Sequence, residues 1–156
     1  MKYRLTSAAD ADVLAILRQT RRDFGRGQLS IYAQIIDLGI SMIADNPSRP
    51  ACIDRGDIRK GLKSFHLEFA AKRRRGAAHM LYFTEMRDAT GAPEVVVLRV
   101  LHEAMEPKRR LIRALRDQDD DSPTTPPEPS TRKAPENPSQ AARASTDPDA
   151  TPRRRR

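Results

Sequence analysis

Cysteine is almost absent from this sequence: Cys52 is the only one among 156 residues, and there is no tryptophan. A single thiol cannot form a disulfide within the chain, so the fold must hold together without one. Such a chain suits a reducing compartment, and we expect it in the cytoplasm. Cys52 also has no neighbour at the spacing of metal ligands, so we assign no metal and no cofactor.

Long apolar segments are also lacking. No apolar run approaches the roughly 20 residues that a membrane-spanning helix needs. Met1 is not followed by the basic and then apolar residues of a secretory signal sequence. We therefore expect a soluble protein with no membrane partner.

Aromatic residues are few and unevenly placed. All seven precede position 84, and beyond Leu115 alanine is the only apolar residue type. Eight of the twelve prolines lie in residues 117–156, among Ser, Thr, Asp and Glu. A segment of this composition cannot bury enough apolar surface to offset its ordering entropy. We predict one folded domain, residues 1–116, followed by a disordered tail, residues 117–156.

Positive charge is concentrated in the predicted domain. Residues 1–116 contain 22 Lys and Arg against 13 Asp and Glu, a net charge of +9, whereas residues 117–156 contain 7 against 8. The basic character therefore belongs to the folded part. A positive surface attracts nucleic acid, an anionic membrane or an acidic protein, and charge alone does not choose among them.

Two helices are predicted in the first third of the chain, after a short strand at residues 2–5. Gly25 and Gly27 are expected to end the first helix, and Asn46 followed by Pro47 the second. The short turn between two amphipathic helices predicts an antiparallel helical hairpin. Gly39 would let the second helix approach the first closely. The apolar stripe predicted for the first helix consists of Val13, Ile16, Leu17, Thr20 and Phe24.

Three strands and a last helix are predicted in the remainder of the domain. Residues 62–69 and 79–86 alternate in polarity, and residues 95–101 are nearly all branched aliphatics, which is typical of the most buried strand. Residues 102–116 then carry apolar side chains at helical spacing. The fold class is therefore α+β: an antiparallel sheet of about four strands, covered by an N-terminal helical hairpin, with a short C-terminal helix.

Four stretches of the sequence are similar to one protein family, in the same order and spacing. They are residues 3–12, residues 40–47 with their closing Asn-Pro, residues 57–65 and residues 100–105. On these stretches the chain resembles the ParE-type toxins of the RelE/ParE superfamily, from bacterial type II toxin–antitoxin systems. The insert at residues 69–78 and the tail depart from the family pattern.

The resemblance implies a toxin that a cognate ParD-like antitoxin silences with an acidic or amphipathic segment. Released toxins of the ParE branch inhibit DNA gyrase, whereas those of the RelE branch cleave mRNA in the ribosome. Residues 57–65 match the gyrase branch better, which favours a binding protein over an enzyme. A third alternative is a chain that has lost toxicity and binds only an antitoxin or DNA.

Cleavage of the RelE kind needs cations on the phosphate and a group that moves a proton. The candidates for these roles are Arg59, Lys60, Lys63, His66, His79, Arg99 and His102. We single out His66, Arg99 and His102, although their spacing alone does not show that they converge. At such positions, histidines are more often half-exposed residues of a sheet. The sequence therefore suggests no confident catalytic set.

Clustered cations are the expected contacts for gyrase, DNA or the antitoxin. One cluster lies in residues 72–75 and another in residues 108–113, and the alternative for each is a solvated surface. The expected binding residues are Arg59, Lys60, Lys63, Lys72, Arg73, Arg74, Arg75, Lys108, Arg109, Arg110 and Arg113.

Overall fold

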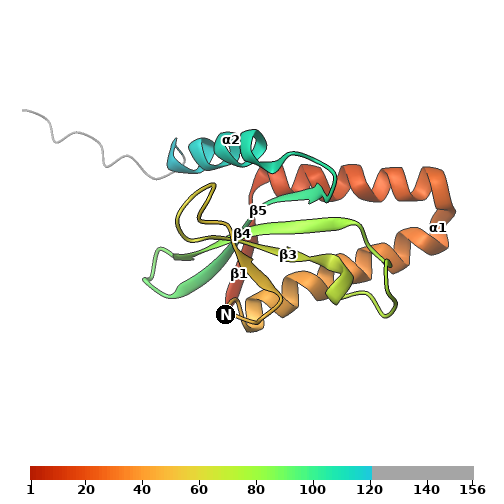
Figure 1. The fold of residues 1–156 in the computed structure, drawn as a ribbon, viewed down its shortest axis with the longest axis horizontal. Helices are drawn as coiled ribbons and strands as arrows, with labels where there is room; N and C mark the ends of the chain where they lie inside the picture. Colours follow the sequence, from red (N-terminus) through yellow and green to blue (C-terminus); the bar gives the residue numbers. More distant parts are fainter. Residues whose placement is uncertain (121–156) are drawn as a thin grey trace, which may run out of the picture. The chain divides into compact units, whose positions relative to one another are not determined.

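A five-stranded sheet lies at the centre of the computed structural model, which describes residues 1–120 (Figure 1). The strand order is β1-β5-β4-β3-β2. β1 runs parallel to β5, and every other pair is antiparallel. The described residues all belong to one compact unit. The strands are β1 Lys2–Leu5, β2 Cys52–Asp54, β3 Leu62–His66, β4 His79–Arg87 and β5 Pro93–His102.

The α+β class is confirmed, but the sheet differs from the prediction in two ways. It has five strands rather than about four, because Cys52–Asp54, expected as part of a loop, pairs with β3. It is mixed rather than antiparallel, because β1 joins β5 in parallel, with Tyr3 opposite Val95. The alternation of side chains in a four-residue strand is the same whether its partner runs parallel or antiparallel. The sequence of residues 2–5 therefore could not predict this pairing.

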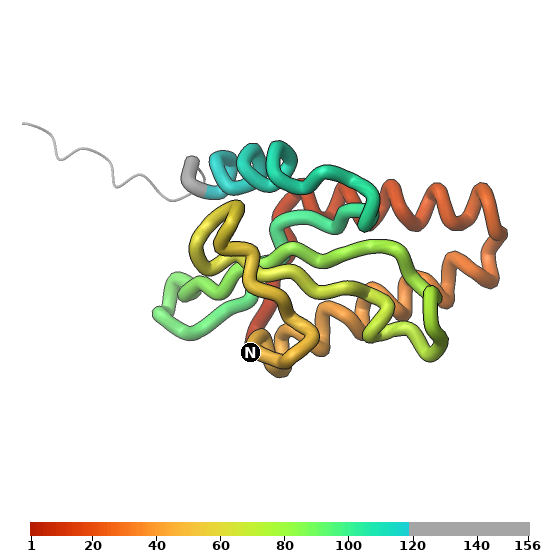
Figure 2. The backbone as a smooth tube through the Cα atoms, viewed as in Figure 1, coloured from red at the N-terminus to blue at the C-terminus, as the bar shows by residue number. Residues whose placement is uncertain are grey.

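The first helix, α1 (Ser7–Asp45), begins at a threonine and is interrupted by a glycine. The Thr6 hydroxyl accepts a hydrogen bond from the Ala9 N–H at 3.1 Å, which satisfies one free donor of the first turn. At Gly25 the φ angle is 85°, in the left-handed region that glycine adopts readily. The chain turns back at this point (Figure 2). The helix ends at Asp45, where Asn46 and Pro47 predicted its end.

Helices cover both faces of the sheet. On one face α1 packs through Ile36, Ile40 and Ile43, and on the other α2 (Pro107–Asp120) packs through Leu111 and Leu115. β5 contributes alternate side chains to the two cores, which explains its nearly continuous apolar run. Residues 95–98 of β5 are accordingly at most 1% exposed.

Two segments depart from their predicted bounds. β3 ends at His66 and a 3-10 helix, η1 (Leu67–Phe69), follows, so Phe69 is 59% exposed rather than buried. α2 extends to Asp120, so the predicted domain boundary at residue 117 falls inside this helix. The predicted disordered tail lies outside the described residues from residue 121 onward. No helix in residues 1–120 is both long and apolar enough to cross a membrane.

Gly39 faces the sheet, not the first half of α1 as predicted. A Cβ built at this position would collide with the Leu67 side chain and lie 3.5 Å from Leu81. Both leucines are fully buried, so they have little room to move. The glycine therefore lets α1 approach the sheet closely.

Gly39→Val should lower the free energy of unfolding by about 2 kcal/mol, because the cost of overpacking exceeds the gain in helix propensity. Urea denaturation of the purified protein measures the change. Gly27→Ala is the matched control: nothing lies within 4 Å of its added methyl, and it should stabilise the protein by about 0.5 kcal/mol. Equal effects of the two substitutions would contradict the tight packing at Gly39.

Candidate functional site

The C-terminal helix α2 presents a row of cations to solvent. Pro107 stands at its first position, where the missing N–H costs nothing. Leu111, Ala114 and Leu115 are buried against the sheet. Because these residues turn one face inward, the basic side chains occupy the opposite face. The exposed cations are Lys108, Arg109, Arg110, Arg113 and Arg116, and the first four of them are predicted binding residues.

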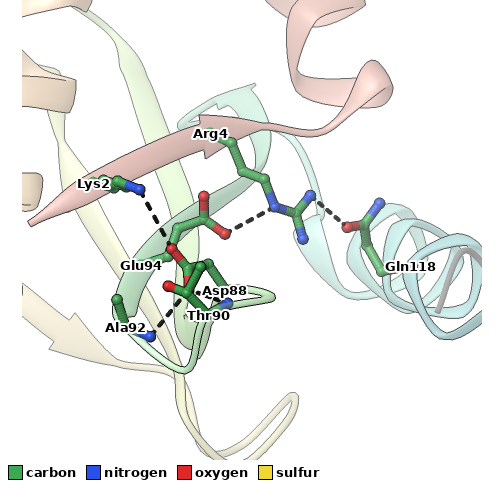
Figure 3. Close-up of polar contacts among 7 residues, drawn as sticks. All are labelled: Lys2, Arg4, Asp88, Thr90, Ala92, Glu94 and Gln118. Carbon is green, nitrogen blue, oxygen red and sulfur yellow. Dashed lines mark hydrogen bonds and ion pairs between the residues drawn. The ribbon is translucent and has the colours of Figure 1, made fainter. Parts of the chain in front are cut away.

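A contact with β1 holds the far end of α2 in place. Arg4 lies between β5 and α2, with Nε 3.1 Å from Glu94 Oε2 and Nη1 3.1 Å from Gln118 Oε1 (Figure 3). In the same view Lys2 Nζ lies 3.6 Å from Asp88 Oδ2 in the turn between β4 and β5. Hydrogen bonds from Thr90 and Ala92 lower the pKa of Asp88 to about 2, so this carboxylate stays charged at neutral pH. Arg4 therefore links β1 to the far end of α2, and Lys2 links β1 to the turn between β4 and β5.

Arg59 and Lys60 extend the positive surface of α2. Both are exposed, and they line a small cavity of about 200 Å³ together with Leu115 and Gln118 of the helix. We call Arg59, Lys60 and the five exposed cations of α2 the α2 basic surface. Arg59 and Lys60 precede the cations of α2 by at least 48 positions in the sequence, and the fold brings the two groups to one side of the sheet.

Lys63 does not belong to this surface. Its Nζ lies 2.6 Å from Glu85 Oε1 and 3.1 Å from the carbonyl oxygen of Pro47. A cation held by a carboxylate and a carbonyl has its donors largely satisfied. Lys63 thus links β3 to β4 and to the residues that follow α1. These contacts disfavour the predicted binding of a partner by Lys63.

The basic loop at residues 72–75 stands apart from α2. All four cations, Lys72, Arg73, Arg74 and Arg75, are exposed. Arg75 has a φ of 56°, and its N–H donates to Glu68 Oε1 at 2.7 Å, so the loop is pinned to η1. Lys72 and Arg73 line a groove of about 460 Å³ with Ile31, Ile35 and Leu38 of α1. The expected basic residues therefore form two surfaces that line different cavities.

Of the three predicted catalytic residues, Arg99 is already paired with a carboxylate of the protein, that of Asp12. Its Nε and Nη2 donate to the carboxylate of Asp12 at 2.7 and 2.8 Å, and both side chains are 15% exposed. The Val100 N–H donates to the same carboxylate at 3.0 Å. The hydrogen bond to Asp12 raises the pKa of Arg99. This pair joins α1 to the C-terminal part of β5, which gives Arg99 a structural role.

His66 and His102 lie at the ends of β3 and β5, which β4 separates, and each has a partner within the protein. His66 Nε2 lies 2.8 Å from Glu103 Oε2, and that hydrogen bond lowers the pKa of Glu103. His102 Nδ1 accepts from the Ala104 N–H at 3.1 Å. Within residues 1–120, no three His, Cys, Asp or Glu side chains are placed to hold a metal ion.

His79 was among the candidates from the sequence, but sequence reasoning missed its contact with Tyr32. The register of β4 and β5 pairs His79 with His102, with ring centroids 5.2 Å apart. Tyr32 comes from α1, and its hydroxyl lies 2.5 Å from His79 Nδ1. Burial and the nearby His102 lower the pKa of His79 to about 4, so the ring is neutral at pH 7. The turn at residues 88–92 starts this hairpin, but a shift in register between Tyr82 and Phe83 places His79 opposite His102, and the sequence carries no signal for that shift.

Burial of His79 predicts that the protein loses stability in mild acid. Its pKa is about 4 in the folded protein against 6.5 for an ordinary histidine, so the unfolded chain binds the proton more tightly. The stability present above pH 6.5 should fall as the pH drops toward 4, by on the order of 2 kcal/mol after allowance for partial exposure. His79→Asn keeps an acceptor for Tyr32 without titrating, and should remove most of this dependence. Urea titrations at pH 7, 5.5 and 4 measure it, and identical pH profiles for both proteins would contradict the prediction.

No protein-family model and no curated protein matches this chain.

Proposed function

We propose that this protein is the toxin of a bacterial type II toxin–antitoxin pair, and that it inhibits DNA gyrase by binding rather than by cleaving a substrate. The resemblance to ParE-type toxins motivates the proposal. The observation that supports it most is the α2 basic surface, which a packed helix holds rigidly toward solvent. A rigid cationic face suits an acidic protein surface or the DNA that gyrase holds. Gyrase works in the bacterial cytoplasm, so the proposal locates the protein there.

The surroundings of the catalytic candidates favour binding over RNA cleavage. Arg99 and His66 each face a carboxylate of the protein itself, Asp12 and Glu103. Stabilising a phosphate in a transition state needs donors that are not already neutralised. Cleavage of mRNA in the manner of RelE toxins is therefore the second alternative, and retention of antitoxin binding without toxicity is the third.

The groove beside the basic loop is where we place the ParD-like antitoxin. Ile31 and Leu38 are 51% and 47% exposed, which is unusual for two aliphatic side chains on one helix face. Lys72 and Arg73 flank them. An amphipathic acidic segment would cover the leucine and isoleucine and pair its carboxylates with the cations. The groove is lined by the half of α1 that follows the interruption at Gly25.

Gyrase activity tests the proposal. The purified full-length chain should block supercoiling of relaxed plasmid, and co-expression with its antitoxin should restore growth of cells that make it. Normal supercoiling at a large excess of the chain would contradict the proposal. A parallel reaction with translating ribosomes separates the alternatives, because cut mRNA in that reaction would support the RelE-type activity instead.

A further inference from the structure

An open cavity of about 770 Å³ lies between the two halves of α1, the basic loop and the ends of β4 and β5. The α2 basic surface does not contribute to it, and it adjoins the antitoxin groove, with which it shares Gln28, Arg73 and Gly76. Its volume is typical of sites for small molecules. The residues around it also divide into two chemical kinds, which restricts the ligands that it suits.

One part of the cavity carries donors for an anion. Arg73 and Arg75 line it together with His79 and His102. Burial raises the pKa of Tyr32, so its hydroxyl is protonated and donates to His79 Nδ1. The Nδ1 of His102 is likewise an acceptor, for the Ala104 N–H. A ring nitrogen that accepts a hydrogen bond carries no hydrogen, so in both rings the hydrogen lies on Nε2, which remains as a donor.

The other part of the cavity is apolar and includes an exposed aromatic ring. Phe24 was predicted to be buried on the stripe of α1, but it is 73% exposed because it immediately precedes the reversal at Gly25. Ile16 and Met105 line the cavity with it. Gln28, from the second half of α1, adds a side-chain amide that can pair with the polar edge of a planar group.

We propose that this cavity binds a nucleotide, with the phosphate at Arg73, Arg75 and the imidazole N–H groups and the base stacked on Phe24. Arginine pairs with phosphate through two parallel hydrogen bonds, and an exposed aromatic ring stacks on any base. The nucleotide is either a free mononucleotide or one residue of a single-stranded nucleic acid, since both present the same groups. This inference does not depend on the proposed function.

Calorimetric titration of the full-length chain with AMP, adenosine, inorganic phosphate and a 5′-phosphorylated RNA pentanucleotide tests the site. AMP should bind at least 10-fold more tightly than adenosine or phosphate, because only AMP fills both parts of the cavity. Arg73→Gln with Arg75→Gln, and separately Phe24→Ala, should each weaken AMP binding by 10-fold or more. These side chains are exposed, so the variants should fold normally.

Arg74→Gln is the matched control, because Arg74 belongs to the same loop but does not line the cavity. It should leave AMP binding unchanged. Pentanucleotide binding 10-fold tighter than AMP binding would assign the site to nucleic acid, and equal binding would assign it to free nucleotides. No saturation with AMP or RNA at 5 mM would overturn the inference, as would binding that Phe24→Ala and the double arginine variant leave unchanged.

Discussion

Asp12→Ala should destabilise the protein by about 3 kcal/mol. The Asp12 carboxylate accepts hydrogen bonds from Arg99 Nε and Nη2 and from the Val100 N–H. Its removal leaves a guanidinium that is only 15% exposed without its counterion, together with an unpaired backbone donor. Urea denaturation at pH 7 measures the loss.

Asp37→Ala provides the comparison for this substitution. Asp37 is an exposed carboxylate in the same helix, and its removal should change stability by less than about 0.5 kcal/mol. Replacing Arg99 by Met in the Asp12→Ala background should recover part of the loss, because the uncompensated charge is gone. A loss below about 1 kcal/mol for Asp12→Ala would show that Arg99 is available for another role.

Removing three cations from α2 should abolish most gyrase inhibition. In the triple variant Lys108→Gln, Arg109→Gln and Arg113→Gln, the concentration needed for half-inhibition should rise about 100-fold, at about 1 kcal/mol for each lost charge-assisted contact. All three side chains are exposed and glutamine is a good helix former, so the fold should persist. Inhibition of supercoiling is the readout.

A second triple variant controls for net charge. Arg18→Gln, Arg21→Gln and Arg26→Gln remove the same number of exposed cations from α1. This protein should inhibit within about 3-fold of the parent, because general attraction between charges is weak at physiological salt. Equal losses for the two triple variants would mean that overall charge, and not the α2 basic surface, drives binding.

Elements with strong periodicity were predictable, and short or interrupted ones were not. The aliphatic run in β5 revealed a strand that is buried on both faces. β2 has only three residues, so it carries no period to detect. Phe24 continued the helical spacing of α1, but the spacing contains no information about where Gly25 turns the chain away from the sheet.

The candidate site was predictable in its residue types but not in its pairings. Charge counting found both basic clusters, and the fold leaves them exposed. It did not find that Lys63 and Arg99 each have a carboxylate partner, because Glu85 and Asp12 lie 22 and 87 positions away. Tyr32 and His79 meet only through the packing of α1 on the sheet, which sequence spacing does not describe.

The measurement that tests the central proposal most directly is the accumulation of gyrase-linked, cleaved DNA as the full-length chain is titrated into gyrase and plasmid. The account predicts that cleaved complexes rise with the parent protein and with the α1 triple variant, and stay at background with the α2 triple variant. Background levels with the parent protein, at concentrations well above that of gyrase, would contradict it.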